Sequence, residues 1–458
     1  MRRRLTRRLL PLGRSSRSKL ETSYAFAVPA GDIQVLEDPA AFRHSLLALI
    51  AQATRRIVLV ALYLQDDDAG REVLDALYAA KKAQPSLEVE VYVDWHRARR
   101  GLIGKAADEG NAKMYRDVAA RRGEGVAIYG VPVQNRELFG VLHLKGFIVD
   151  DHVLYSGASI NDVYLARHGR YRFDRYHLIR HSGLADSMVG FVRHHFRSNE
   201  AVKRIDQASM PATRDLQNAI RHLRRQLQHA HYNVPNEALS EGMVAVTPLL
   251  GFGRSDNQLN DTLLKLLRDA RQRVILLTPY FNLPRPVRAV LGTLLRRGCS
   301  IDIMVGDKTA NDFYIPPTQP FRKIGLLPYL YENNLRRFAR SHRAHMARGQ
   351  LKLWLWRDGD NSYHLKGLLI DDEIAVITGN NLNPRAWALD IENGLLLRDP
   401  SHLLTAQHEA EWLALRSHAT QLADYHSLDN PRRYPAEVRT LLRRLSRVRL
   451  DRLLNRLL

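Results

Sequence analysis

The chain has 458 residues, which is more than one hydrophobic core usually serves, so its length favours two domains or two halves of one large unit. Its 69 Lys and Arg residues against 48 Asp and Glu give a formal charge of +21, which indicates a polyanionic partner: nucleic acid, an anionic membrane surface or a phosphorylated substrate. The single cysteine, Cys299, excludes an intramolecular disulfide and a cysteine-rich metal site.

The first 23 residues form an arginine-rich tail. No apolar segment follows these charges, so the tail does not have the pattern of a secretory signal. No run of about 18 apolar residues occurs anywhere, so the sequence predicts no membrane-spanning helix. We therefore expect a cytoplasmic protein that is at most peripheral to a membrane.

A first unit is expected over residues 24–205. The apolar run 57–64 is typical of a strand buried on both faces, the pattern of residues 70–82 predicts a helix, and the alternation over 89–93 predicts a second strand. This strand–helix–strand order indicates parallel α/β construction.

The same order returns in a second unit, expected over residues 241–430. Helices are predicted over 259–267 and 287–295, and strands over 273–281 and 301–305. Tyr63 matches Tyr280 and Leu74 matches Leu291, both at a spacing of 217. The sequence therefore predicts a duplicated domain, with residues 206–240 as a helical connector.

The last segment, residues 431–458, combines leucines at helical spacing with many arginines and predicts a basic amphipathic helix. Two interpretations are open. The helix either packs on the second unit with a solvated basic face, or it adsorbs to anionic lipid headgroups at about 1 kcal/mol per basic residue.

One nine-residue phrase occurs twice, as HLKGFIVDD at residues 143–151 and HLKGLLIDD at 364–372. Residues two apart on an extended strand point to the same face, so His143 would lie beside Lys145, and His364 beside Lys366. A hydrophobic core has no use for a repeated histidine and lysine. The repetition therefore indicates a chemical site to which both units contribute.

His-x-Lys-x4-Asp, twice, with a small polar turn after each copy, resembles the phospholipase D superfamily. Within it, the phrases at 60–70, 93–101, 306–316, 327–338 and 378–387 are similar to the type I phosphatidylserine synthases of Gram-negative bacteria. This resemblance implies an α/β fold of two duplicated phospholipase D-like lobes with the active site between them, followed by the basic amphipathic C-terminal helix. It also implies CDP-diacylglycerol and L-serine as substrates, an anionic membrane surface as a partner of the basic termini, and neither a cofactor nor a metal.

The resemblance assigns roles to individual residues. His143 would be the nucleophile that forms a phosphatidyl-histidine intermediate, and His364 would be the acid and base. The transferred phosphate would be stabilised by two ammonium groups and two neutral donors, namely Lys145, Lys366, Asn161 and Asn383. Substrate contacts are expected from Ser159, Asn381, Tyr63 and Tyr280.

Each catalytic imidazole needs a partner on its second nitrogen. We expect Glu392 to serve His364 and Asp174 to serve His143, each within its own unit. Asp150 and Asp371, at the ends of the motifs, are expected to shape the lobes.

Two other functions are compatible with the motifs. A cardiolipin synthase or a phospholipase D shares the chemistry but uses another acceptor or donor. A nuclease is suggested by the charge, but the basic residues concentrate at the termini around leucines and lack the interleaved aromatic residues of a nucleic-acid surface.

Overall fold

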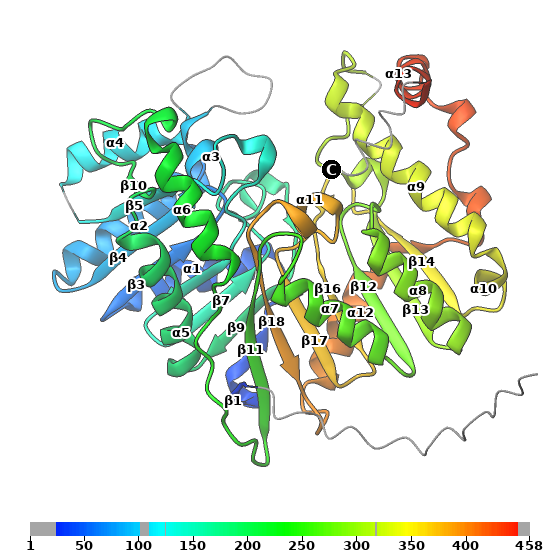
Figure 1. The fold of residues 1–458 in the computed structure, drawn as a ribbon, viewed down its shortest axis with the longest axis horizontal. Helices are drawn as coiled ribbons and strands as arrows, with labels where there is room; N and C mark the ends of the chain where they lie inside the picture. Colours follow the sequence, from blue (N-terminus) through cyan, green and yellow to red (C-terminus); the bar gives the residue numbers. More distant parts are fainter. Residues whose placement is uncertain (1–23, 101–109, 124, 317, 448–458) are drawn as a thin grey trace, which may run out of the picture.

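The computed structural model describes residues 24–100, 110–123, 125–316 and 318–447. The tail expected over residues 1–23 and the last part of the terminal helix, residues 448–458, lie outside the described residues. Within the described part, the chain forms two α/β lobes that lie side by side (Figure 1). The predicted fold class is confirmed.

The first lobe is built on a mixed sheet, which has eight strands in the part of the chain that the structure describes. In spatial order these are β10 (Lys203–Arg204), β5 (Ala127–Val131), β4 (Glu88–Asp94), β3 (Arg56–Val60), β6 (Gly146–Val149), β7 (His152–Ser156), β9 (Tyr176–Arg180) and β2 (Ile33–Val35).

The second lobe is built on a sheet with nine described strands. Their order is β1 (Phe26–Pro29), β11 (Met243–Gly251), β18 (Glu392–Arg398), β17 (Ile374–Thr378), β16 (Gly367–Ile370), β12 (Arg273–Leu277), β13 (Ser300–Gly306), β14 (Leu351–Trp356) and β19 (Ala419–Gln421). A separate short pair, β8 (Arg172–Phe173) and β15 (Ser362–Tyr363), joins the lobes.

Helices flank both sheets. The first lobe carries α1 (Pro39–Gln52), α2 (Asp68–Ala83), α3 (Trp95–Arg99), α4 (Asn111–Arg122) and α5 (Ser182–Val192), and α6 (Gln217–Gln228) follows. The second lobe carries α7 (Gln258–Asp269), α8 (Arg285–Arg297), α9 (Leu327–Ser341), α10 (Arg343–Ala347), α11 (Pro384–Ala388), α12 (Thr405–Ser417) and α13 (Ala436–Arg447).

The predicted duplication of elements is confirmed by the strand pairing. In the first lobe β3 pairs in parallel with β4 and antiparallel with β6, and in the second β12 pairs in parallel with β13 and antiparallel with β16. The helices between them, α2 and α8, bury equivalent apolar residues, including Leu74 and Leu291. The two repeated phrases therefore enter equivalent central strands of the two sheets.

The expected lobe boundary at residue 24 is wrong for the first strand. β1 pairs antiparallel with β11, so the first described strand of the chain completes the sheet of the second lobe (Figure 1). Such an exchange depends on long-range pairing that local sequence patterns do not contain. The expected connector includes α6, whose buried Ile220, Leu223 and Leu227 join the core of the first lobe.

The described part of the C-terminal helix, α13, packs on the second lobe. Val438 is buried against Leu326 and Tyr329, and Leu441, Leu442 and Leu445 are half-buried in the same cluster. The apolar face of α13 is therefore partly covered by the second lobe, and Arg443 and Arg444 are exposed to solvent.

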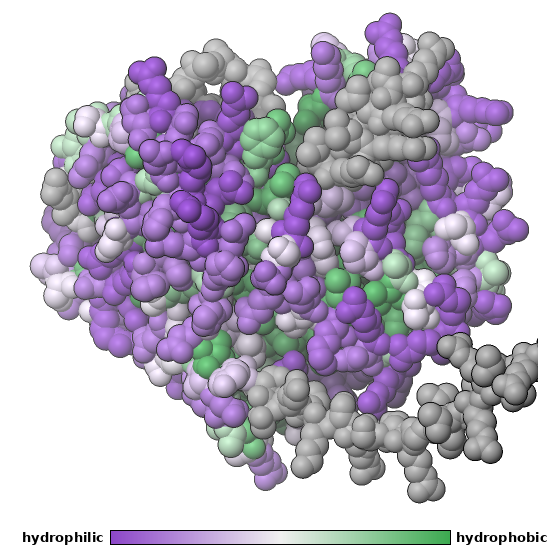
Figure 2. All heavy atoms as spheres, in the orientation of Figure 1, coloured by the Kyte–Doolittle hydropathy of each residue, from purple (hydrophilic) through white to green (hydrophobic). Residues whose placement is uncertain are grey.

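The face of the molecule in Figure 2 is mostly hydrophilic, and its hydrophobic residues lie scattered in small groups. Of the helices in the described ranges, none is both long enough and apolar enough to cross a bilayer.

Candidate active site

The first motif histidine is held against the second lobe. The His143 amide donates to the carbonyl of Ile391 at 3.0 Å, next to an isolated bridge between Leu142 and Ile391. Glu392 follows directly, and its carboxylate oxygens lie 2.8 and 2.9 Å from His143 Nδ1. Both side chains are buried, so the imidazole is fixed through one nitrogen and its Nε2 is left for chemistry.

The second motif histidine is held against the first lobe in the same way. The His364 amide donates to the carbonyl of Phe173 at 2.8 Å, at the end of the β8–β15 pair. Asp174 follows directly, and its Oδ2 lies 3.1 Å from His364 Nδ1. The Tyr164 hydroxyl lies 2.9 Å from the same ring nitrogen, and the Lys366 ammonium contacts it as well.

The expected pairing of histidines with carboxylates is therefore wrong: Glu392 serves His143, and Asp174 serves His364. The physical reason is that each motif segment pairs, just ahead of its strand, with a segment of the other lobe, through the Leu142–Ile391 bridge and the β8–β15 pair. Each carboxylate lies where a strand of its own lobe meets the motif segment of the other lobe, so the partner that is nearer in sequence is not the partner in space. Each half of the site is thus incomplete without the other lobe.

The histidine and lysine of each motif lie just ahead of the strand rather than on it. β6 begins at Gly146 and β16 at Gly367, with φ of 143° and 142°, a backbone conformation that favours glycine. A side chain at Gly367 would also lie 2.4 Å from the Val376 carbonyl oxygen. The glycines let the motif segments leave the sheets and reach the opposite lobe.

Both motif lysines are buried in the site. Lys366 Nζ lies 2.7 Å from Asp174, and Lys145 Nζ lies 3.4 Å from the Ser159 hydroxyl. The Lys145 backbone is clamped from the other lobe by Asn393, which accepts from its amide and donates to its carbonyl. The two ammonium groups are therefore held in place before any substrate binds.

The small-residue turn after each motif makes room for the lysine of the other lobe. A Cβ at Gly157 would lie 2.8 Å from the Asp174 carboxylate oxygens and 2.9 Å from Lys366 Nζ. A Cβ at Gly379 would lie 2.9 Å from Lys145 Cγ. Glycine at these positions is required by close packing of the site itself.

The polar residues of these turns lie at the site. Asn161 and Asn383 were expected to contact the phosphate, but their carboxamide oxygens bind backbone amides of the turns. Asn161 accepts from the Tyr164 amide, and Asn383 caps α11 by accepting from the Ala386 amide. These carboxamides shape their turns, and the amino group of Asn161 also donates to the Tyr63 hydroxyl. The buried carboxamide oxygen of Asn381 has no hydrogen-bond partner among the described residues.

The two matched tyrosines are buried beside the turns. Tyr63 accepts from the Asn161 carboxamide at 3.3 Å and lies under the guanidinium of Arg97. Tyr280 lies with its ring edge-on to His364, at 6.0 Å between centroids, and donates to Asp312 at 2.8 Å.

Three residues near His364 were not predicted. Tyr164 contacts the imidazole directly, and Arg172 lies over the Tyr164 ring while pairing with Asp312 at 2.8 Å. Asp312 lies in the phrase 306–316 that carried the family resemblance, which was the available signal. Tyr164 and Arg172 belong to no repeated or family phrase.

The aspartates that end the motifs bind backbone instead of the reacting centre. Asp150 accepts from the amides of Thr54, Arg55 and Arg56, and Asp371 accepts from those of residues 271–273. Each carboxylate thus fixes the loop that leads into the central strand, β3 or β12.

Burial sets the protonation of the site. Desolvation, with the charge of Lys145 and Lys366 added, lowers the pKa of His143 well below its ordinary value. Burial and the Lys366 charge lower the pKa of His364 to about 4, and burial lowers the pKa of Lys145 to about 7. Both imidazoles are therefore neutral at pH 7, and an anion that enters beside Lys145 would raise the pKa of this lysine again.

No group of three or more His, Cys, Asp or Glu side chains in the described ranges is arranged to hold a metal ion. The cationic groups that the described site offers to a phosphate are the two lysines.

Two similar α/β lobes whose His-x-Lys motifs meet at one buried site define the class of phospholipase D-like proteins. A family model described as "Cardiolipin synthase, PLD-like domain" matches residues 263–414.

Relatives that match nearly the whole chain identify a particular family within this class. The CDP-diacylglycerol–serine O-phosphatidyltransferase of Escherichia coli K12 is 49% identical over 428 residues, covering 93% of this chain and 94% of that protein. The enzyme of the same name from Haemophilus influenzae is 45% identical and covers 94% of this chain and 96% of its own. The crystal structure of phosphatidylserine synthase from H. influenzae superposes with a TM-score of 0.92 at 44% identity, covering 95% of this chain and 98% of that one. The chain belongs to the family of CDP-diacylglycerol–serine O-phosphatidyltransferases.

Proposed function

We propose that the chain transfers the phosphatidyl group of CDP-diacylglycerol to L-serine, giving phosphatidylserine and CMP in phospholipid biosynthesis. The observation that carries this proposal is the pair of buried neutral imidazoles, each fixed through Nδ1 by a carboxylate of the other lobe, in a chain 49% identical to an enzyme of that name.

In the first step the Nε2 lone pair of His143 attacks the phosphorus of the phosphatidyl group. The bond from phosphorus to the oxygen of CMP breaks, and CMP leaves with the electron pair. The positive charge that develops on the imidazole is stabilised by Glu392, which is 2.8 Å from Nδ1. Lys145 and Lys366 stabilise the negative charge on the non-bridging oxygens.

In the second step neutral His364 takes the proton of the serine hydroxyl as its oxygen attacks phosphorus. The phosphorus–nitrogen bond breaks, and His143 returns to its neutral form. Asp174 and Tyr164 hold the His364 ring and stabilise the imidazolium that forms.

The protonation of the site supports a CDP-lipid as donor. CMP leaves as a weakly basic phosphate, which needs little help from an acid, whereas the alkoxide leaving group of an ordinary phosphodiester needs a protonated histidine. His364, with a pKa lowered to about 4 by burial and Lys366, is unprotonated at neutral pH, so it can accept the serine proton but has no proton to give to a leaving group.

A membrane surface is part of this proposal, because the donor is a lipid. The exposed Arg443 and Arg444 of α13 offer positive charge to anionic headgroups, and the arginine-rich tail adds to it in the sequence. We place the working enzyme on the cytoplasmic face of the inner membrane as a peripheral protein.

The test is incubation with CDP-diacylglycerol and L-serine in mixed micelles that contain a metal chelator. We expect CMP and phosphatidylserine in equal amounts; absence of both products refutes the function. Omitting serine while supplying glycerol-containing acceptors or water distinguishes cardiolipin synthase and phospholipase D activity, and a DNA substrate tests for nuclease activity.

The division of labour is tested with His364→Ala. This variant is expected to keep some release of CMP and to lose transfer to serine. His418→Ala, at a half-exposed histidine outside the site, is the matched control and should behave as the wild type. Equal loss of both activities in His364→Ala contradicts the assignment of roles.

A further inference from the structure

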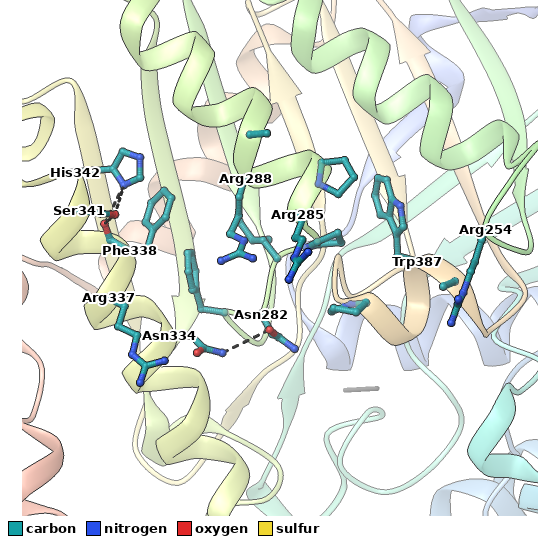
Figure 3. A pocket seen from close by; sticks show the side chains of 17 residues that line it. Arg254, Asn282, Arg285, Arg288, Asn334, Arg337, Phe338, Ser341, His342 and Trp387 are labelled. Carbon is teal, nitrogen blue, oxygen red and sulfur yellow. Dashed lines mark hydrogen bonds between the residues drawn. The ribbon is translucent and has the colours of Figure 1, made fainter. Parts of the chain in front are cut away.

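A groove of about 1200 Å³ opens in the second lobe between α8, α9 and α11 (Figure 3). The groove is larger than the roughly 300–1000 Å³ of pockets that hold drug-sized ligands. L-serine and CMP are both small, so neither accounts for its size.

The groove is lined by residues that directly follow two residues of the candidate active site in the chain. Phe281 and Asn282, which line it, directly follow Tyr280, whose ring lies against His364. At the other turn Pro384, also in the lining, directly follows Asn383. The groove and the candidate active site therefore share the chain segments 280–282 and 383–384, although the motif histidines and lysines do not line the groove.

The lining is apolar at its base. Phe281 and Leu283 are each 3% exposed, and the Phe281 ring packs on Phe338 at 5.1 Å between centroids. Trp387 of α11 is half-buried on the other side. Because Phe281 and Leu283 are almost fully covered, the accessible apolar lining includes the half-buried Trp387 and the exposed Ala289.

Four arginines edge this apolar base: Arg254, Arg285, Arg288 and Arg337. In Figure 3 the side chains of Arg254, Arg285 and Arg288 point the same way, with Trp387 between the first two. None of the four pairs with a carboxylate within the described ranges. Unpaired guanidinium groups beside a hydrocarbon surface are complementary to an anionic amphiphile.

The first lobe has acidic residues where the second lobe has the start of this arginine-edged groove. Because Tyr63 matches Tyr280, residues 66–68 of the first lobe correspond to 283–285, and they read Asp-Asp-Asp where the second lobe has Leu-Pro-Arg. Asp67 caps α2 through the Gly70 amide, and Asp68 pairs with a histidine. The duplicated fold is thus asymmetric at this point, acidic in one lobe and basic and apolar in the other.

We propose that the groove binds the acyl chains of CDP-diacylglycerol, with the four arginines attracting and flanking its negatively charged head. This inference rests on the proposed function and adds where the lipid lies: on the second lobe, between α8, α9 and α11. The lipid enters the site from that side, and the acidic turn of the first lobe disfavours the mirror-image placement.

The test compares dibutyroyl and dihexanoyl CDP-diacylglycerol, both below the concentration at which they aggregate, so that no lipid surface takes part. The longer lipid has two more methylene groups on each of its two chains. For the wild type kcat/KM should rise about tenfold, the gain for burying roughly half of these added groups. Ala289→Trp, at an exposed groove position on α8, should reduce this rise to less than about twofold. Ala410→Trp, at an exposed position on α12 outside the groove, is the matched control and should keep the rise.

Thermal unfolding of both variants checks that they are folded. A rise that persists in Ala289→Trp, or no rise in the wild type, overturns the inference. Loss of vesicle binding in Ala289→Trp with an unchanged rise also overturns it, because the groove would then hold a bulk lipid. If the wild type turns over neither substrate, the proposed function itself has failed.

Discussion

The contact between His143 and Glu392 leads to a quantitative prediction for Glu392→Gln. The amide can still accept a hydrogen bond from Nδ1, so the ring keeps its orientation and tautomer. Burial raises the pKa of Glu392, and the positive charge that forms on His143 favours the ionised carboxylate, so the variant lacks the negative charge that faces the imidazole at that moment. Two unit charges about 4 Å apart interact by about 4 kcal/mol at an effective dielectric constant of about 20, which corresponds to about a thousandfold in rate.

The assay is exchange of labelled CMP into CDP-diacylglycerol without serine, which reports the first step and its reversal alone. Glu392→Gln should slow this exchange about a thousandfold. Asp390→Asn is the matched control, because this carboxylate is buried two residues away and binds the Val141 amide and Arg385 instead of a histidine. Its exchange should stay within about tenfold of the wild type.

Asp174→Asn sharpens the comparison, because Asp174 holds the other histidine. This variant should lose transfer to serine more than it loses exchange. If Glu392→Gln keeps rapid exchange while Asp174→Asn abolishes it, His364 is the nucleophile and the reasoning is refuted.

Three further predictions follow from packing, burial and charge. Gly157→Ala places a methyl group 2.9 Å from Lys366 Nζ and should lower kcat/KM at least about tenfold. Gly190→Ala, which has open space around it, is the control and should leave kcat/KM unchanged. Equal effects of the two substitutions would contradict the close-packing argument. Burial lowers the pKa of His177 to about 3, against about 6.5 in the unfolded chain. The unfolded state therefore binds more protons than the folded state as the pH falls from about 6.5 toward 4. Over this window the free energy of unfolding decreases by about 1.4 kcal/mol per pH unit for this group. Urea unfolding should therefore show a shallower pH dependence over that window in His177→Gln, and an unchanged slope would refute the burial argument. Replacing both Arg443 and Arg444 by Gln should weaken binding to anionic vesicles about thirtyfold at low salt and by less at high salt, as measured by flotation. The control is a variant in which two exposed arginines of α6 are replaced by Gln. Equal loss of binding in the two variants would show that the attraction is nonspecific.

The sequence was sufficient for the parts of the fold and site that depend on local patterns. Apolar periodicity predicts β3, α2 and β4 and their counterparts β12, α8 and β13 close to their observed bounds. The repeated phrase identifies His143, Lys145, His364 and Lys366, because a histidine and a lysine repeated in register have no role in a core. The structure brings all four into one buried region.

The partners of these residues could not be predicted, because they depend on contacts between the lobes. Glu392 and Asp174 were recognised as carboxylates near the motifs, but the exchange of partners follows from pairing of segments more than 180 residues apart in sequence. The position of β1 in the second sheet has the same cause. Tyr164 and Arg172 lie in no repeat, so periodicity and duplication give no signal for them.

The most direct test of the mechanism is to trap the covalent intermediate. The protein is incubated with CDP-diacylglycerol labelled in the phosphatidyl phosphate, without serine, quenched under alkaline conditions and digested with trypsin. An acid-labile phosphatidyl adduct on His143, in the peptide of residues 137–145, is the predicted result, and added serine should discharge it before the quench. An adduct on His364, in the peptide of residues 358–366, or CMP release with no adduct under these conditions, would contradict the account.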